Sequence, residues 1–231
     1  MAQEANVVMK HVVLLGDSIF DNAAYVDGGP AVLDQLRERL PAGWQATLLA
    51  VDGSTTSDVA GQLARLPKAT SHLVISTGGN DALGHSGILE ERARSVEEVL
   101  SRLASIREDF QRQYRRMLEA VRAAARSTLL CTIYDPCFPD ARLQRCAVAA
   151  LAVFNDVVSR EAVAAGIPLI DLRLVFSGSS DYANPIEPSV QGGAKLAATI
   201  ARIVTSHDFS TSHTVVFGSG QKAVFGSAKK S

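Results

Sequence analysis

Short apolar runs rich in β-branched residues alternate along the chain with longer stretches in which apolar residues recur every three or four positions. The short runs predict five strands, at residues 12–15, 46–51, 73–76, 128–133 and 168–172. The longer stretches predict helices at residues 31–40, 56–66, 96–125, 142–165 and 190–204. Strands that alternate with helices in this way are typical of a parallel sheet with helical crossovers.

Parallel crossovers are right-handed, so the predicted helices cover both faces of the sheet. We therefore predict an α/β fold, a three-layer α/β/α sandwich around a flavodoxin-like, five-stranded parallel sheet. With 231 residues, of which 47% are hydrophobic, the chain can bury one sizeable core. We assign residues 1–205 to this domain and residues 206–231 to a C-terminal extension.

The C-terminal extension differs in composition from the domain. Its apolar segments 214–217 and 223–225 flank Gly218-Ser219-Gly220, which predicts a β-hairpin. The same content of Gly, Ser and Lys is also compatible with a flexible end, and both interpretations stay open. A folded hairpin needs a partner for its apolar face, either the main domain or a second subunit, so a homo-oligomer is one expectation.

Charge and cysteine content exclude several classes of function. A formal net charge of −1 gives no electrostatic basis for binding nucleic acid or a membrane surface. No apolar run approaches the roughly 18 residues of a membrane-spanning helix and no secretory signal is apparent, so we expect a cytoplasmic protein. Cys131, Cys137 and Cys146 lack zinc-site spacing and are odd in number. With no dinucleotide or phosphate-binding motif, we expect no cofactor and no metal.

Four short polar blocks fall where predicted strands end or a predicted helix begins. They are, in chain order, Gly16-Asp17-Ser18, Gly53, Gly78-Gly79-Asn80-Asp81 and Glu187-Pro188-Ser189. In an open α/β sheet, the loops at the carboxyl ends of the strands converge on one edge, where ligands bind. The blocks therefore predict one site. We expect the long helix after residue 96 and the segment 134–139 to frame it.

The order and content of these blocks resemble the SGNH hydrolases, also called the GDSL family of esterases and lipases, over residues 12–204. The resemblance implies that Ser18 is the nucleophile, which attacks an ester carbonyl and forms an acyl-enzyme. It also implies an oxyanion hole made of the backbone N–H groups of Ser18 and Gly53 and the side-chain amide of Asn80. The expected substrate is a small-molecule ester.

The last block departs from the family pattern, which usually reads Asp-x-x-His-Pro-Ser-x-x-Gly. Aligned on Pro188, Ser189 and Gly192, this chain has Glu187 in the histidine position and Asn184 in the aspartate position. We interpret Glu187 as the base, because a carboxylate that accepts the serine proton becomes neutral and needs no anionic supporter. Burial raises the pKa of a glutamate. From the ordinary pKa of glutamate we expect activity to persist at mildly acidic pH.

Five histidines are alternative bases. His85 follows the third strand, on the same edge as the nucleophile, and is either a loop residue or a second candidate base. His11 and His72 lie at strand starts, on the opposite edge, and His207 and His213 belong to the C-terminal extension. The extension reaches the site only if it folds back or is donated by a neighbouring subunit.

Other residues of the blocks also have more than one interpretation. Ser18 can instead be the cap of a helix, Gly53 can be required only by a turn, and the Asn80 side chain can hydrogen-bond to the backbone of its own loop. Asp21 and Asn22 either bind substrate or hold the loop in place. A second hypothesis for the whole chain is a non-catalytic or regulatory module that binds acyl or sugar ligands on the same fold.

Overall fold

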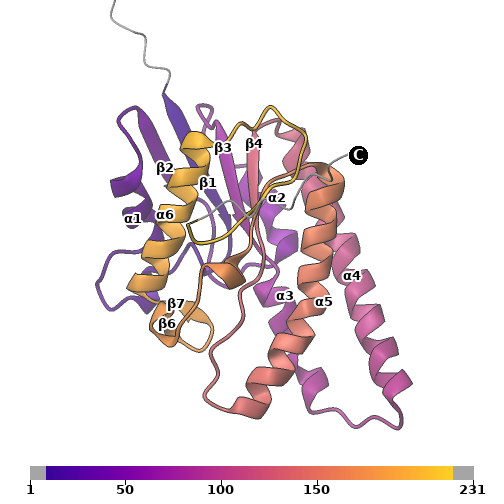
Figure 1. The fold of residues 1–231 in the computed structure, drawn as a ribbon. Coiled ribbons are helices and arrows are strands. Elements are labelled where there is room, and N and C mark those ends of the chain that lie inside the picture. The colour runs from indigo at the N-terminus through magenta and orange to yellow at the C-terminus, as the bar shows by residue number, and fades with distance from the viewer. Residues whose placement is uncertain (1–8, 221–231) are drawn as a thin grey trace, which may run out of the picture.

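The computed structural model describes residues 9–220, which form a twisted sheet with helices on both faces (Figure 1). The strands of the sheet are β1 (Lys10–Gly16), β2 (Trp44–Leu48), β3 (His72–Ser76), β4 (Ser127–Cys131), β5 (Leu169–Ile170) and β8 (Val216–Phe217). Their order is β2-β1-β3-β4-β5-β8, and all neighbouring pairs are parallel. This confirms the predicted α/β fold with a flavodoxin-like strand order.

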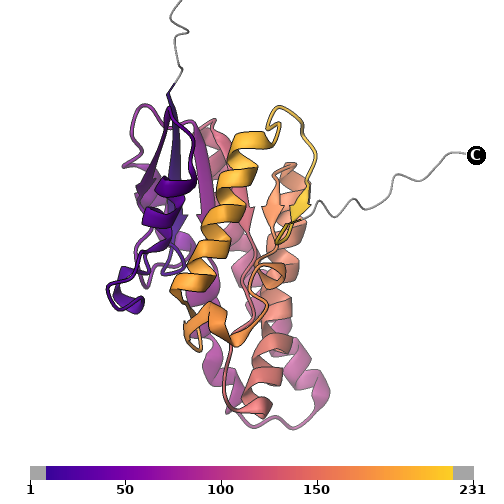
Figure 2. The same ribbon diagram turned by 60° about the vertical axis from the view of Figure 1, so that its left-hand side comes forward.

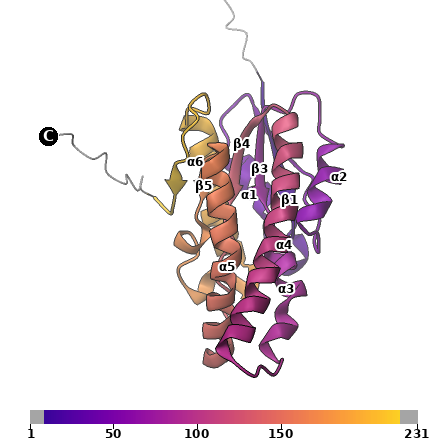
Figure 3. The ribbon, with the colours of Figure 1, turned by 90° about the vertical axis from the view of Figure 1, so that its right-hand side faces the viewer.

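Six α-helices surround this sheet in the described part of the chain. They are α1 (Val32–Arg39), α2 (Val59–Leu63), α3 (Gly79–Gly84), α4 (Val96–Ala123), α5 (Ala141–Ala165) and α6 (Val190–Ser206). Helices α1 and α6 cover one face, whereas α2, α4 and α5 cover the other (Figures 1 and 3). Within residues 9–220, no helix combines the length and apolar character that crossing a membrane requires.

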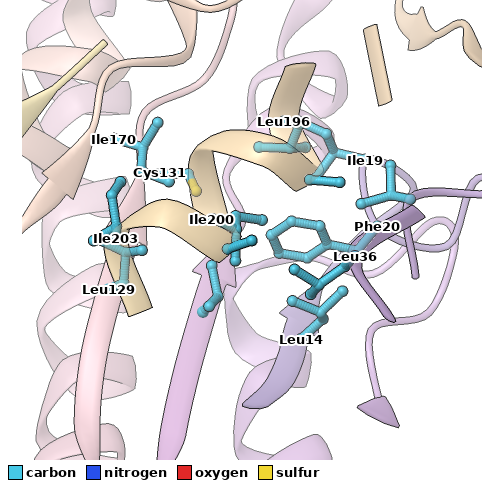
Figure 4. Close-up of a cluster of buried hydrophobic side chains, with 14 of the residues drawn as sticks. Leu14, Ile19, Phe20, Leu36, Leu129, Cys131, Ile170, Leu196, Ile200 and Ile203 are labelled. Atoms are coloured by element: carbon cyan, nitrogen blue, oxygen red, sulfur yellow. The ribbon is translucent and has the colours of Figure 1, made fainter. Parts of the chain in front are cut away.

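Successive side chains of β1 point to opposite faces of the sheet and so contribute to both halves of the core. Val12 and Leu14 face α1 and α6, whereas Val13 and Leu15 face α2, α4 and α5. All four side chains are fully buried, as expected for a central parallel strand covered on both faces. Phe20, which follows the strand, packs into the first of these two clusters (Figure 4).

The sheet has one strand more than the five predicted. Strand β8 extends the sheet next to β5, with hydrogen bonds from the Leu169 N–H to the Val215 oxygen (3.0 Å) and from the Asp171 N–H to the Phe217 oxygen (2.8 Å). Figure 2 shows it, in yellow, at the edge of the sheet. The segment predicted as the first arm of a hairpin thus pairs with the main domain. The predicted second arm, residues 223–225, lies outside the described residues.

A second, two-stranded sheet was not predicted either. Strands β6 (Tyr182–Asn184) and β7 (Glu187–Pro188) pair in antiparallel register just before α6. Strands this short carry no usable alternation of apolar and polar residues. The pair matters for the site because it places Glu187 at the same edge as the carboxyl end of β1.

Candidate active site

The nucleophile candidate Ser18 stands in a sharp turn directly after β1. Gly16 has a φ of +124°, and a Cβ atom there would lie 1.6 Å from the backbone oxygen of Ser76 on β3. Only glycine fits, because it alone tolerates this backbone conformation and this close approach. The Phe20 N–H donates to the Asp17 oxygen at 3.2 Å, so Ser18 lies in the first turn of a short helical segment.

Ser18 and Glu187 meet although 169 positions separate them in the chain. The Ser18 hydroxyl donates to Glu187 Oε1 at 2.9 Å, and both side chains are buried. The other carboxylate oxygen, Glu187 Oε2, is buried and has no hydrogen-bond partner among the described residues. The pair therefore has the geometry of a hydroxyl and the base that activates it.

Hydrogen bonds to the loop after β4 hold the turn that carries Glu187. The Tyr134 hydroxyl donates to the Ile186 oxygen, and the Tyr182 hydroxyl donates to the Asp135 oxygen at 2.7 Å. The Cys137 N–H also donates to the backbone oxygen of residue 185, at 2.8 Å. These contacts fix the β6–β7 turn against the loop that follows a sheet strand, so Glu187 does not depend on its own two-residue strand for its position.

On its other side, the β6–β7 pair is held to α6 by Asp181. This fully buried carboxylate accepts hydrogen bonds at Oδ2 from Lys195 Nζ (2.8 Å) and from the backbone N–H groups of residues 177–178 (2.8 and 3.1 Å). Its backbone oxygen accepts the Ser189 N–H at 2.9 Å. A Cβ atom at Gly192 would lie 2.1 Å from that oxygen, so the glycine of the last block permits this packing.

Hydrogen bonds join the loop after β2, which carries Gly53, to the start of α3, which carries Asn80. The Asn80 amide donates to the Ser54 oxygen at 2.8 Å, and Asp81 accepts the Thr56 N–H at 2.9 Å. Gly53, with a φ of +80°, sits at the start of the same loop and has open space where a Cβ atom would be. An amide nitrogen has two hydrogens, so Asn80 keeps one donor for a ligand.

The carboxyl groups on both sides of the nucleophile have raised pKa values. Burial raises the pKa of Glu187 from 4.5 to about 7, against the opposing hydrogen bond from Ser18, and the negative charge of Asp52 adds to the rise. Burial also raises the pKa of Asp17 to about 7, partly offset by the Ile19 N–H, with Glu187 and Asp81 adding to it. With a pKa of about 7, Glu187 is half ionised near pH 7 and less so in mild acid, which argues against the expected activity at mildly acidic pH.

A cavity of about 890 Å³ opens directly onto this pair. Ser18, Asn80 and Glu187 contribute to its inner wall, whereas α4 and α5 line its outer part with apolar side chains. Tyr134 and Phe138, from the segment predicted to frame the site, also line it. A pocket with few polar groups converging at one end is what a small-molecule site requires.

Asn184, which was predicted as a catalytic residue, makes its hydrogen bond outside the cavity. Asn184 is exposed, and its Oδ1 accepts the Ile186 N–H at 3.0 Å, within the turn between β6 and β7. No hydrogen bond joins its side chain to the Glu187 carboxylate in the described residues. Its structural part is to shape the turn, and its predicted catalytic role stays a prediction.

Asp21 and Asn22 hold the loop after the nucleophile. Asp21 Oδ2 accepts the Asp52 N–H at 3.0 Å, and the fully buried Asn22 accepts the Val32 N–H at 2.9 Å, at the start of α1. Neither residue lines the cavity, so the geometry favours the interpretation that they hold the loop.

The histidines lie as expected with respect to the sheet. His85 lines the cavity, on the same side as the nucleophile. His11 and His72 are buried near the starts of β1 and β3, and His207 caps the far end of α6. His213 is exposed in the segment before β8. The described part of the chain gathers no group of three or more His, Cys, Asp or Glu side chains that could hold a metal ion.

Several residues that build the site gave no signal in the sequence. Asp181 and Lys195 look like ordinary surface charges, and Tyr182 stands outside every block. The pattern of α5 does mark Phe154 as apolar, but an apolar helical position does not tell whether it faces a core or a cavity. Only the tertiary structure makes that distinction.

Comparisons with known proteins complete the description of the site. Residues 14–195 match the model of the GDSL-like Lipase/Acylhydrolase family. The fold is similar to that of the lipase/acylhydrolase from Enterococcus faecalis (TM-score 0.60, 23% identity, 85% of this chain and 95% of that one). It is also similar to the inhibitor-bound aryl esterase of M. smegmatis (TM-score 0.62, 16% identity, 85% of this chain and 99% of that one). A third similar structure is phospholipase A1 from Streptomyces albidoflavus (TM-score 0.57, 17% identity, 87% of this chain and 99% of that one). Among curated proteins, none matches the sequence.

Proposed function

The chain belongs to the GDSL-like lipase/acylhydrolase family, and we propose that it is a carboxylic ester hydrolase in which Ser18 is the nucleophile and Glu187 is the base. The observation that carries this proposal is the 2.9 Å hydrogen bond from the Ser18 hydroxyl to Glu187 Oε1, at the inner end of the cavity. It supplies the contact that a histidine makes in the usual family pattern.

Acylation begins when the Ser18 oxygen attacks the carbonyl carbon of the ester. The hydroxyl proton passes to Glu187 Oε1, which becomes a neutral acid, and the carbonyl oxygen becomes an oxyanion. When the tetrahedral intermediate collapses, the bond from carbon to the alkoxy oxygen breaks. Glu187 returns the proton to that oxygen, and the alcohol leaves.

In this proposal, neutral donors stabilise the oxyanion. Asn80 offers its second amide hydrogen, and its first one anchors it to the Ser54 oxygen. The backbone N–H groups of Ser18 and Gly53 are the other donors in this proposal. Each donor of this kind is typically worth about 3 kcal/mol of transition-state stabilisation.

Deacylation uses the same carboxylate a second time. A water molecule attacks the acyl carbon, gives a proton to Glu187, and the Ser18 oxygen leaves and recovers that proton as the acid product departs. In the acyl-enzyme Ser18 has no hydroxyl hydrogen left to donate, so Glu187 Oε1, which accepts from Ser18 in the free enzyme, can accept the hydrogen bond from this water.

The raised pKa gives Glu187 the basicity that an ordinary glutamate lacks. At about 7, it is close to the ordinary pKa of histidine, about 6.5. Burial supplies this increase, and it needs no anionic partner of the kind that aspartate provides for a histidine base. Asn184 in the usual aspartate position is consistent with such a base.

The proposal is tested with Ser18→Ala and Glu187→Gln, assayed on p-nitrophenyl butyrate at pH 8. We expect kcat to fall about 10³-fold or more in each, because the nucleophile or its base is lost while the cavity keeps its shape. Wild-type turnover in Glu187→Gln contradicts the assignment of the base. His85→Ala is the matched control, since it removes the alternative base on the same cavity and is expected to keep its activity.

A fluorophosphonate probe separates the enzyme from a binding module. We expect a covalent adduct on Ser18 in the wild-type protein and none in Ser18→Ala. The absence of an adduct, together with no cleavage of any ester, contradicts the proposed function.

A further inference from the structure

The outer part of the cavity is a mostly apolar channel, lined by α4, α5 and residues of the segment 82–90. On α5, Phe154, Leu151, Ala147 and Leu143 recur every three or four residues and line it, and Leu103 stands opposite on α4. Nearer the sheet, the two helices pack directly on each other in the core. Both helices continue beyond the edge of the sheet (Figure 3), and there their facing sides line the cavity.

Large apolar side chains line this channel without being covered. Leu83, Leu89 and Leu143 are 43%, 41% and 40% exposed, yet all three belong to the cavity wall. An apolar wall that is open to solvent gains stability when an apolar ligand removes it from water. The wall is continuous with the inner end, where Ser18 and Glu187 stand, so an apolar group attached to the reacting carbonyl would cover it.

The length of the channel sets the size of that group. From position 154 to position 143, α5 advances about 16 Å at about 1.5 Å per residue. An extended chain of tetrahedral carbons advances about 1.2 Å per bond, which is the advance of an extended backbone divided by its three bonds. About 12 to 14 carbons therefore fill the channel.

We propose, resting on the proposed function, that this channel binds the acyl chain of the substrate and that the enzyme acts on esters of medium to long fatty acids, with an optimum near twelve carbons. The alcohol then leaves on the other side of Ser18. The α4–α5 wall then determines which acyl-chain lengths bind, and residues at the edge of the sheet carry out the chemistry.

The first experiment measures kcat/KM for p-nitrophenyl esters from acetate to palmitate, each below its micelle concentration. We expect dodecanoate to exceed butyrate by at least about 30-fold, since each fully buried methylene adds up to about fourfold. Equal values for butyrate and dodecanoate overturn the proposal.

Ala147→Phe tests the location of the chain. The new ring blocks the channel about halfway along, so we expect the ratio of kcat/KM for dodecanoate to kcat/KM for butyrate to fall at least tenfold. Ala149→Phe is the matched control, because Ala149 is exposed on the same helix and does not line the cavity. An equal effect of both substitutions overturns the proposed location.

Cys146 supplies a readout that does not depend on turnover. It is exposed and lines the channel, so an alkylating reagent reacts with it when the channel is empty. In Ser18→Ala, we expect saturating dodecanoic acid to slow the alkylation of Cys146 at least fivefold, and butyric acid to leave it unchanged. Absence of protection overturns the acyl site, whatever the activity. Protection in a protein that hydrolyses no ester supports the site and contradicts the proposed function.

Discussion

Two buried carboxylates stand at the two ends of the short β6–β7 segment, and their surroundings differ in one respect. Asp181 faces Lys195 and two backbone N–H groups, and these donors lower its pKa although burial alone raises it. Glu187 faces one hydroxyl and no cation, and burial raises its pKa to about 7. Each has one oxygen without a partner in the described residues, so the difference lies in the donors to the other oxygen, a cation and two backbone N–H groups in one case and a single hydroxyl in the other.

This difference separates a structural carboxylate from a reactive one. With its ion pair, Asp181 keeps its charge at any pH at which the protein works, and it fixes the β6–β7 pair to α6. Glu187 lacks such a partner, so its proton affinity is matched to accepting and returning a proton near neutral pH. One segment of seven residues thus contains both an anchor and a base.

The largest expected effect that tests this comparison is on the pH dependence of the wild-type enzyme. The base works only as an anion, so kcat/KM should be level above pH 8, halve near pH 7 and fall about 100-fold by pH 5. A profile on p-nitrophenyl butyrate measures this. Full activity at pH 5 would show that Glu187 does not have the proton affinity assigned to it.

The next effect concerns the anchor. Asp181→Asn removes the charge opposite Lys195 within a buried site, and we expect the free energy of unfolding to fall by about 3 kcal/mol. Urea denaturation at pH 8 measures the loss. The folded fraction should keep the wild-type pH midpoint of activity, because Asp181 takes no part in the chemistry. A shifted midpoint would contradict the division of roles.

The same change from carboxyl to amide at Glu187 should raise the free energy of unfolding, whereas Asp181→Asn should lower it. Because the pKa of Glu187 is raised in the folded state, its carboxyl group stabilises the folded protein fully at pH values below 4.5, its ordinary pKa. This stabilisation is lost as the pH rises to about 7. Glu187→Gln removes the buried anion, so we expect it to stabilise the protein by about 2 kcal/mol at pH 8 and by almost nothing at pH 4. Equal shifts in stability at both pH values would exclude this linkage.

The smallest expected effect is that of a single surface charge on the base. The negative charge of Asp52 contributes to the raised pKa of Glu187. Asp52→Asn should therefore lower the pH midpoint of activity by a few tenths of a unit, about 0.5 kcal/mol. Asp34→Asn, on the exposed side of α1, is the control and should leave the midpoint unchanged. An upward shift in Asp52→Asn would contradict the sign.

The sequence predicted the elements that are long enough to show a regular spacing of apolar residues. Five strands and the long helices were visible because apolar periodicity extends over whole elements, as along residues 96–125. Strands β6 and β7 were missed, because two or three residues show no alternation of apolar and polar positions. The segment 214–217, which contains β8, was predicted as a strand, but its pairing with β5 was not. The contact of Ser18 with Glu187 was anticipated as a hypothesis from the family pattern.

What the sequence did not predict was the environment of the site. The expected activity in mild acid started from the ordinary pKa of glutamate, whereas burial in the folded chain raises the pKa of Glu187 to about 7. The part of α4 in framing the cavity was expected, but the part of α5 was missed, for a related reason. Leu143 and Phe154 follow the same apolar pattern, but one is exposed at the cavity wall and the other is buried near the core.

The contact of Gly16 with Ser76 bears on how this protein can be changed. Gly16 lies two residues before the nucleophile, and Ser76 lies four residues before Asn80. One contact between backbones thus sets the spacing between the proposed nucleophile and the proposed oxyanion donor, and no side chain can be inserted there. The reaction centre therefore tolerates almost no variation, whereas the α4–α5 wall is independent of it. A mutant library directed at that wall should yield new selectivities at high frequency, and one directed at the strand ends should yield mostly inactive proteins.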